Sequence, residues 1–236
     1  IMKNPIIVAL DVPTAEQAFS LVKQVAPFVG AFKVGSELFT AVGPDIVRGI
    51  HDRGGMVMLD LKYHDISNTV AKAVANAVLL GVRMITIHTS GGLEMMQAAE
   101  KSAQDTAKTF DWEVPVVLGV TVPTSLNGKD LDQIGVWTDN VRLQVKKLAQ
   151  LAVDAGLRGL VCSPLEVADL RKWLPVTTQL VVPGIRASSD AKGDQKRTLS
   201  AKEAMDAGAN WLVIGRPIYE AKDPRQAAEE ILASLN

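Results

Sequence analysis

Short apolar runs that alternate with helical patterns constrain the fold of this chain more than any other sequence feature. The runs are rich in β-branched residues, as expected for strands of a parallel sheet that is buried on both faces. Strands are predicted at Ile6–Leu10, Ala31–Val34, Val57–Leu61, Met84–His88, Val116–Val120, Gly159–Cys162, Gln179–Val182 and Trp211–Ile214. Helices are predicted at Thr14–Val25, Pro44–Arg53, Ser67–Leu80, Leu93–Thr106, Val141–Ala155, Pro164–Leu174, Ala201–Ala207 and Pro224–Leu235. Eight alternations within 236 residues predict a (β/α)₈ TIM barrel, an α/β fold.

The turns between these elements favour the barrel over a doubly wound open sheet, which is the alternative fold. An open sheet would usually carry fewer strands and a glycine-rich G-x-G-x-x-G first turn, but here that turn reads Asp11-Val12-Pro13-Thr14. One junction repeats, in which a helix ends at a glycine and a strand follows. It occurs at Gly81, Gly156 and Gly208, where we expect the left-handed backbone that turns a helix back toward the sheet.

Composition excludes several classes of protein. With 47% hydrophobic and 22% charged residues, the chain can bury a full core as a single domain, residues 1–236. A formal net charge of −1 is not the electrostatic footprint of a protein that binds nucleic acid or an anionic membrane. No apolar run reaches the ~20 residues of a membrane-spanning helix, and no signal-peptide pattern is present, so a cytoplasmic protein is expected. The single cysteine, Cys162, excludes an internal disulfide and a cysteine-cluster metal site.

Charged side chains lie where the first three predicted strands end. In a (β/α)₈ barrel, the carboxyl ends of the strands form the active site. Because side chains alternate along a strand, small or apolar residues and charged ones share the inward face. These are Ala9 with Asp11, Ala31 with Lys33, and Met58 with Asp60 and Lys62. The pattern predicts a barrel mouth that admits a polar ligand.

The ends of the last two strands have the features of a phosphate site. Pro183-Gly184-Ile185-Arg186 follows the seventh strand, and Gly215-Arg216 follows the eighth. Loops at these positions of barrels often bind phosphate through backbone N–H groups and a basic side chain. The polar segment from Ala187 to Ser200 lies between them and is predicted to be a lid, with Gln195 as its contact to the phosphate.

Lys62 is the candidate for the central chemical role. Asp60 and Asp65 flank it in the sequence, and two carboxylates favour the charged form of a lysine. This predicts a proton donor and a fixed positive charge, not a Schiff-base nucleophile. Such a site suits a reaction that develops negative charge and then takes up a proton, as decarboxylation and enolate formation both do.

The remaining reactive side chains are interpreted as structural. His64 and His88 lie near Asp60 and Asp65, but barrel histidines more often make hydrogen bonds than bind metal, and the Lys62 ammonium competes for the same carboxylates. No metal site is therefore predicted. Cys162 has no evident general base nearby in the sequence and is expected to be an inert core thiol.

With these residues in view, the chain resembles the orotidine 5′-monophosphate decarboxylase family over essentially its whole length. Tyr63 stands where the family usually has phenylalanine, and Ser67 where it often has proline. Both flank the charged residues and leave them in place. The segments that carry the resemblance are Ala9-Leu10-Asp11, Lys33-Val34-Gly35, Asp60-Leu61-Lys62-Tyr63-His64-Asp65-Ile66, Asn68-Thr69, Thr121-Val122-Pro123-Thr124-Ser125, Pro183-Gly184-Ile185-Arg186, Gln195 and Ile214-Gly215-Arg216.

The resemblance implies an enzyme that decarboxylates orotidine 5′-monophosphate to UMP without a metal or cofactor, in a homodimer with shared active sites. Carried over by position, Lys33, Asp60, Lys62 and Asp65 form an alternating charged network, in which Lys62 protonates C6 of the pyrimidine and Asp65 reaches into the partner's site. It further implies that Asp11, Lys33 and Thr69 of the partner subunit hold the ribose, that Thr124 and Ser125 lie by the pyrimidine, and that Arg186, Gln195, Gly215 and Arg216 surround the phosphate.

Other enzymes of the same fold, and a binding protein without catalysis, remain as alternatives. Sugar-phosphate decarboxylases and hexulose-phosphate synthases share the D-x-K-x-x-D pattern but use Mg²⁺ held partly by a glutamate on the second strand, where this chain has Lys33. Ribulose-phosphate epimerases need metal-binding histidines at several strand ends, and here only His88, with His64 nearby, is available. A binding protein without catalysis would have little use for a complete acid–lysine–acid array, which is costly to maintain.

Overall fold

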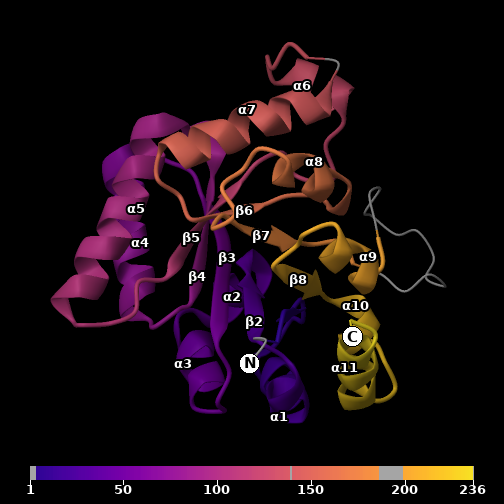
Figure 1. Cartoon of the computed structure of the whole chain (residues 1–236). Helices are drawn as coiled ribbons and strands as arrows, with labels where there is room; N and C mark the ends of the chain where they lie inside the picture. Colours follow the sequence, from indigo (N-terminus) through magenta and orange to yellow (C-terminus); the bar gives the residue numbers. More distant parts are fainter. Residues whose placement is uncertain (1–3, 139, 186–198, 236) are drawn as a thin grey trace.

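Eight parallel strands form a closed barrel in the computed structural model, which describes residues 4–138, 140–185 and 199–235 (Figure 1). Each strand pairs with the next along the chain, and β8 closes the barrel by pairing with β1. The strands are β1 (Ile6–Ala9), β2 (Ala31–Gly35), β3 (Val57–Tyr63), β4 (Met84–His88), β5 (Val116–Val120), β6 (Gly159–Val161), β7 (Gln179–Val182) and β8 (Trp211–Ile214). The predicted (β/α)₈ fold is thereby confirmed.

Helices surround the barrel, and each connection crosses from one strand to the next parallel strand (Figure 1). The α-helices are α1 (Ala15–Val25), α2 (Ser36–Val42), α3 (Asp45–His51), α4 (Ser67–Leu79), α5 (Gly92–Thr109), α6 (Gly128–Gln133), α7 (Val141–Asp154), α8 (Val167–Arg171), α9 (Ala201–Asp206), α10 (Arg216–Tyr219) and α11 (Pro224–Ala233). Three 3₁₀ turns in the described residues complete the list: Ala26–Phe28, Thr89–Gly91 and Pro164–Glu166.

The helix predictions were wrong in two respects. The single helix expected over Pro164–Leu174 is a 3₁₀ turn followed by α8, which ends at Arg171. The short helices α2, α6 and α10 were not predicted. They have seven, six and four residues, about two turns at most, which is too short for a hydrophobic period to be recognised.

The core has two layers, separated by the wall of the barrel. The inner cluster fills the barrel itself and contains Ile7, Ala9, Ala31, Met58, Met84, Val116, Leu118, Val181, Trp211 and Val213. The outer cluster lies between strands and helices and includes the alternate residues Val8, Phe32 and Leu59. The inward faces predicted for the first three strands are therefore correct at Ala9, Ala31 and Met58.

The glycine junctions have the predicted conformation. Gly81, Gly156 and Gly208 have φ angles of 77°, 84° and 108°, in the region that residues with a Cβ rarely adopt. Each joins the end of a helix to the strand that returns through the barrel wall. Among the described residues, no helix is long and apolar enough to cross a membrane.

Candidate active site

A cavity of about 700 Å³ opens at the carboxyl ends of the strands. Its floor includes the inner-core residues Ala9, Met58 and Val213, so a polar mouth lies above an apolar barrel interior. The predicted site residues that line it are Asp11, Lys33, Asp60, Lys62, Thr124, Ser125, Gly215 and Arg216. Strand ends that lie far apart in the sequence thus meet around one space large enough for a nucleotide-sized ligand.

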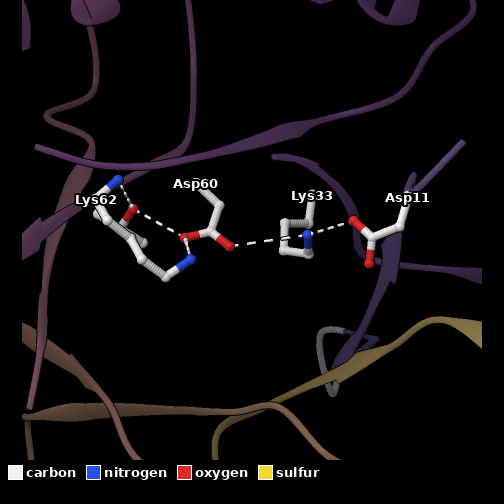
Figure 2. A network of polar contacts seen from close by, with 5 residues as sticks. Asp11, Lys33, Asp60 and Lys62 are labelled. Atoms are coloured by element: carbon white, nitrogen blue, oxygen red, sulfur yellow. Dashed lines mark hydrogen bonds and ion pairs between the residues drawn. The ribbon is translucent and has the colours of Figure 1, made fainter. Parts of the chain in front are cut away.

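Four charged side chains form a row of alternating sign along one wall of this cavity (Figure 2). Lys33 Nζ donates to Asp11 Oδ1 at 2.8 Å and lies 3.8 Å from Asp60 Oδ2. Lys62 Nζ donates to Asp60 Oδ1 at 2.8 Å. The side chains of Lys33 and Asp60 are only 12% and 11% exposed, so the centre of the row is shielded from water and its interactions are strong.

The backbone at Lys62 departs from the regular strand that was predicted to end at Leu61. Leu59 pairs with Ile85 and Tyr63 with Ile87, so four steps along β3 match two steps along β4. Lys62 lies in this irregular stretch with a φ of 50°, in the left-handed region that costs an L-residue about 1–2 kcal/mol. Asp60 and Lys62 do line the same cavity, as predicted. The reason differs from the prediction, because the irregular backbone of β3 places the two side chains there, not the alternation of a regular strand.

Asp60 is held as a carboxylate by its neighbours. Burial acts to raise its pKa, but the ammonium groups of Lys33 and Lys62, together with hydrogen bonds from Lys62 and Thr86, outweigh burial and hold the pKa below its ordinary value. The Thr86 hydroxyl donates to Asp60 Oδ1 at 3.0 Å. The row therefore keeps a fixed negative charge next to a lysine ammonium.

The two histidines and the cysteine near the cavity do not form a metal-binding cluster. The rings of His64 and His88 are 5.6 Å apart, and burial, followed by His64 and Lys62, lowers the pKa of His88. Burial raises the pKa of the Cys162 thiol far above its ordinary value, so the inert thiol predicted at this position is supported. Over residues 4–138, 140–185 and 199–235, no three His, Cys, Asp or Glu side chains come together as a metal site requires.

Comparison with known proteins decides the family. Residues 4–231 match the model of the Orotidine 5'-phosphate decarboxylase / HUMPS family. The chain belongs to this family. Orotidine 5'-phosphate decarboxylases from Opitutus terrae and Idiomarina loihiensis are 50% and 48% identical, over 99% and 98% of this chain and 99% and 97% of theirs. The crystal structure of Orotidine 5'-phosphate decarboxylase from Lactobacillus acidophilus superposes with a TM-score of 0.88 at 33% identity, and the match covers 99% of both chains.

Not all the residues expected from the decarboxylase family meet in this cavity. Asp65 and Thr69 are exposed and are not part of the cavity lining. Asp65 Oδ1 accepts a hydrogen bond from the backbone N–H of Ile66 at 2.6 Å, and the Ile66 side chain is 71% exposed. Arg186 and Gln195, expected at the phosphate, lie outside the described residues, as does most of the predicted lid.

Three side chains in or next to the cavity were not predicted from the sequence. Glu37 and Tyr219 line the cavity, and Thr86 contacts Asp60 from β4. Thr86 could have been found, because Met84 belongs to the inner core and the residue two positions later faces the same way. A polar residue on the inward face of β4, two positions after the core residue Met84, was the available signal.

Proposed function

We propose that this protein decarboxylates orotidine 5′-monophosphate to UMP and CO₂, the last step of de novo pyrimidine synthesis. Its family, and the names of relatives that match it along nearly the full length of both chains, support the activity. The observation that carries the proposal is the row Asp11–Lys33–Asp60–Lys62, with its two central side chains shielded from water, beside a cavity of nucleotide size. The direct test is the loss of the orotate absorbance when orotidine 5′-monophosphate is added to the pure protein.

In this mechanism, the row stabilises the charge that forms when CO₂ leaves. The bond between C6 and the carboxylate breaks, and its electron pair stays on C6 in the plane of the ring, where the ring cannot delocalise it. The Lys62 ammonium is assigned to that position, where it stabilises the carbanion with little reorganisation, because Asp60 already holds the ammonium at 2.8 Å. Lys62 then donates a proton to C6, and the resulting amine is protonated again by water.

Besides holding Lys62, Asp60 is assigned an effect on the substrate carboxylate. Its pKa is held low, so it remains an anion beside the carboxylate that will leave. Two adjacent carboxylates repel each other, and departure of CO₂ removes one of them. Lys33, which lies between Asp11 and Asp60, keeps the row close to neutral and is assigned to a ribose hydroxyl together with Asp11.

Other residues of the cavity wall are assigned to the rest of the pyrimidine ring and to the phosphate. Thr124 and Ser125, which follow β5, are assigned to the pyrimidine ring. Gly215 and Arg216 begin α10 after β8 and are assigned to the phosphate, with Arg186 and Gln195 from the segment between β7 and α9. Energy from binding the distant phosphate can then be used to close the lid and stabilise the transition state at C6.

Arg216→Ala is expected to raise KM at least tenfold, with a smaller loss of kcat. Arg216 lines the cavity and is assigned to the phosphate, not to the reacting C6, so its removal should weaken phosphate binding more than chemistry. Steady-state kinetics with orotidine 5′-monophosphate test this. Arg48→Ala, which removes an arginine paired with surface Asp45 of α3, is the matched control and should leave both constants unchanged. An unchanged KM for Arg216→Ala would place the phosphate elsewhere.

We further propose that catalysis needs no metal. The family model that matches also covers the sugar-phosphate branch, in which Mg²⁺ is expected to be held partly by a carboxylate at the end of the second strand. Here β2 carries Lys33, two residues before its end at Gly35, and the Lys33 ammonium lies 2.8 Å and 3.8 Å from two carboxylate oxygens. A lysine at this position takes the place of a bound cation.

Full activity is therefore expected after exhaustive treatment with EDTA, with no gain when Mg²⁺ is added back. The measurement is kcat/KM for orotidine 5′-monophosphate before chelation, after it, and after addition of Mg²⁺. Activity that disappears with EDTA and returns with Mg²⁺ would assign the protein to the metal-dependent branch.

A homodimer with shared active sites is also proposed, because some of the expected site residues do not reach the cavity of their own chain. Asp65 and Thr69 are exposed, and between them the apolar side chain of Ile66 is 71% exposed. A two-fold interface on this surface would bury Ile66 and carry Asp65 and Thr69 to the cavity of the partner subunit. Each active site would then hold Lys62 from one chain and Asp65 from the other.

A further inference from the structure

We propose that Thr86 is a positioning residue, whose buried hydroxyl holds Asp60 and the backbone of Lys62 in the arrangement that catalysis requires. Thr86 lies in β4 and is completely buried. It does not line the cavity, so it acts on the substrate only through the two residues that it holds. This inference rests on the proposed roles of Asp60 and Lys62.

The first contact supports the irregular backbone of β3. Residues on either side of Thr86, Ile85 and Ile87, pair with Leu59 and Tyr63, so the ladder is regular on both sides of the irregular stretch. The backbone N–H of Lys62 donates to Thr86 Oγ1 at 2.9 Å. The hydroxyl thus supplies an acceptor at Lys62, where φ is 50° and the surrounding structure must stabilise the conformation.

The second contact fixes the carboxylate of Asp60. A hydroxyl has one proton, and the Lys62 N–H can only donate, so the proton of Thr86 goes to Asp60 Oδ1, at 3.0 Å. The same oxygen accepts from Lys62 Nζ at 2.8 Å, while Oδ2 lies 3.8 Å from Lys33 Nζ. With Oδ1 held by two donors, the carboxylate cannot rotate without losing a hydrogen bond.

The Thr86 side chain therefore fixes the positions of both Asp60 and Lys62. It orients the anion through Oδ1 and orients the lysine through its backbone, from a strand more than 20 residues away in the sequence. Loss of the hydroxyl would leave the N–H of Lys62 without this acceptor and would free the carboxylate to turn. Misplacement of a catalytic group by about 1 Å can cost roughly 10²-fold in rate.

Thr86→Val is the decisive variant, because valine keeps the branched shape and loses only the hydroxyl. We expect kcat to fall about 10- to 100-fold with KM for orotidine 5′-monophosphate changed less than about threefold. Thr86→Ser keeps the hydroxyl and should recover kcat to within a few-fold of the wild type. Thr89→Val is the matched control, since Thr89 is also completely buried but donates to the carbonyl oxygen of Val120, and its kcat should stay near the wild-type value.

The pH profile separates positioning from general loss of stability. Within the described part of the chain, the charged and titratable groups near Asp60 are Lys33, Lys62 and His88, and Thr86→Val leaves all three in place. Because the hydroxyl lowers the pKa of Asp60, its removal should raise that pKa and move the acid limb of kcat to higher pH. Thr86→Ser and Thr89→Val should not move it.

Carboxyl ¹³C NMR can follow the titration of Asp60 directly, and it measures the effect of Thr86 on the pKa of Asp60 without turnover. A wild type that fails to decarboxylate the substrate would overturn the proposed function, and this titration would still decide the role of Thr86. A kcat within twofold of the wild type and an unshifted Asp60 titration in Thr86→Val would overturn the inference. If Thr86→Val does not fold, Thr86→Ala is compared with Thr86→Ser, and equal kcat values would overturn it as well.

Discussion

Lys62→Ala is expected to lower kcat by several powers of ten while the affinity for UMP changes little. The substitution removes a preorganised positive charge and the proposed proton donor together, and each is typically worth about 10²-fold or more. The groups assigned to the ribose and the phosphate, Asp11, Lys33 and Arg216, are untouched. Binding and chemistry should therefore separate.

Single-turnover decarboxylation and UMP binding measure the two effects. Lys101→Ala is the matched control, because Lys101 makes a surface pair with Asp105 and its side chain is 75% exposed. Lys62→Arg adds a second comparison, since arginine keeps the charge but does not release its proton at neutral pH. A kcat for Lys62→Ala near that of Lys101→Ala would contradict the role proposed for Lys62.

Mixing two inactive variants, Lys62→Ala and Asp65→Ala, is expected to restore activity. Each homodimer has a lesion in both of its sites. If Asp65 serves the partner's site, a mixed dimer collects both lesions in one site and leaves the other wild type. Random pairing of equal amounts makes about half of the dimers mixed, so roughly a quarter of all sites should be active, given an isologous interface.

Unfolding and refolding the two variants together, compared with refolding each alone, is the measurement. The control pair is Lys62→Ala with Asp60→Ala. These residues are in contact within one chain, at 2.8 Å, so every site of that mixed dimer carries one lesion and no activity should appear. If verified heterodimers of Lys62→Ala and Asp65→Ala remain inactive, Asp65 acts within its own subunit.

The architecture and much of the cavity lining could be predicted from the sequence because they depend on local patterns. Alternation along β1, β2 and β3 correctly assigned Ala9, Ala31 and Met58 to the interior. The same rule placed Asp11, Lys33 and Asp60 at the strand ends, and the closed barrel brings them to one cavity. The left-handed conformation of Gly81, Gly156 and Gly208 also follows from a local requirement, the end of a helix before a strand.

Only the tertiary structure decided the geometry of the catalytic pair. Alternation assumes a regular strand, whereas β3 changes register against β4, and Lys62 takes a left-handed conformation there. Thr86 bonds to residues 24 and 26 positions before it, so no local pattern contains that contact. The exposure of Asp65 likewise depends on how the turn after β3 lies on the finished barrel. Local periodicity determines which residues face the barrel mouth, but pairing between distant strands determines where their charged atoms are held.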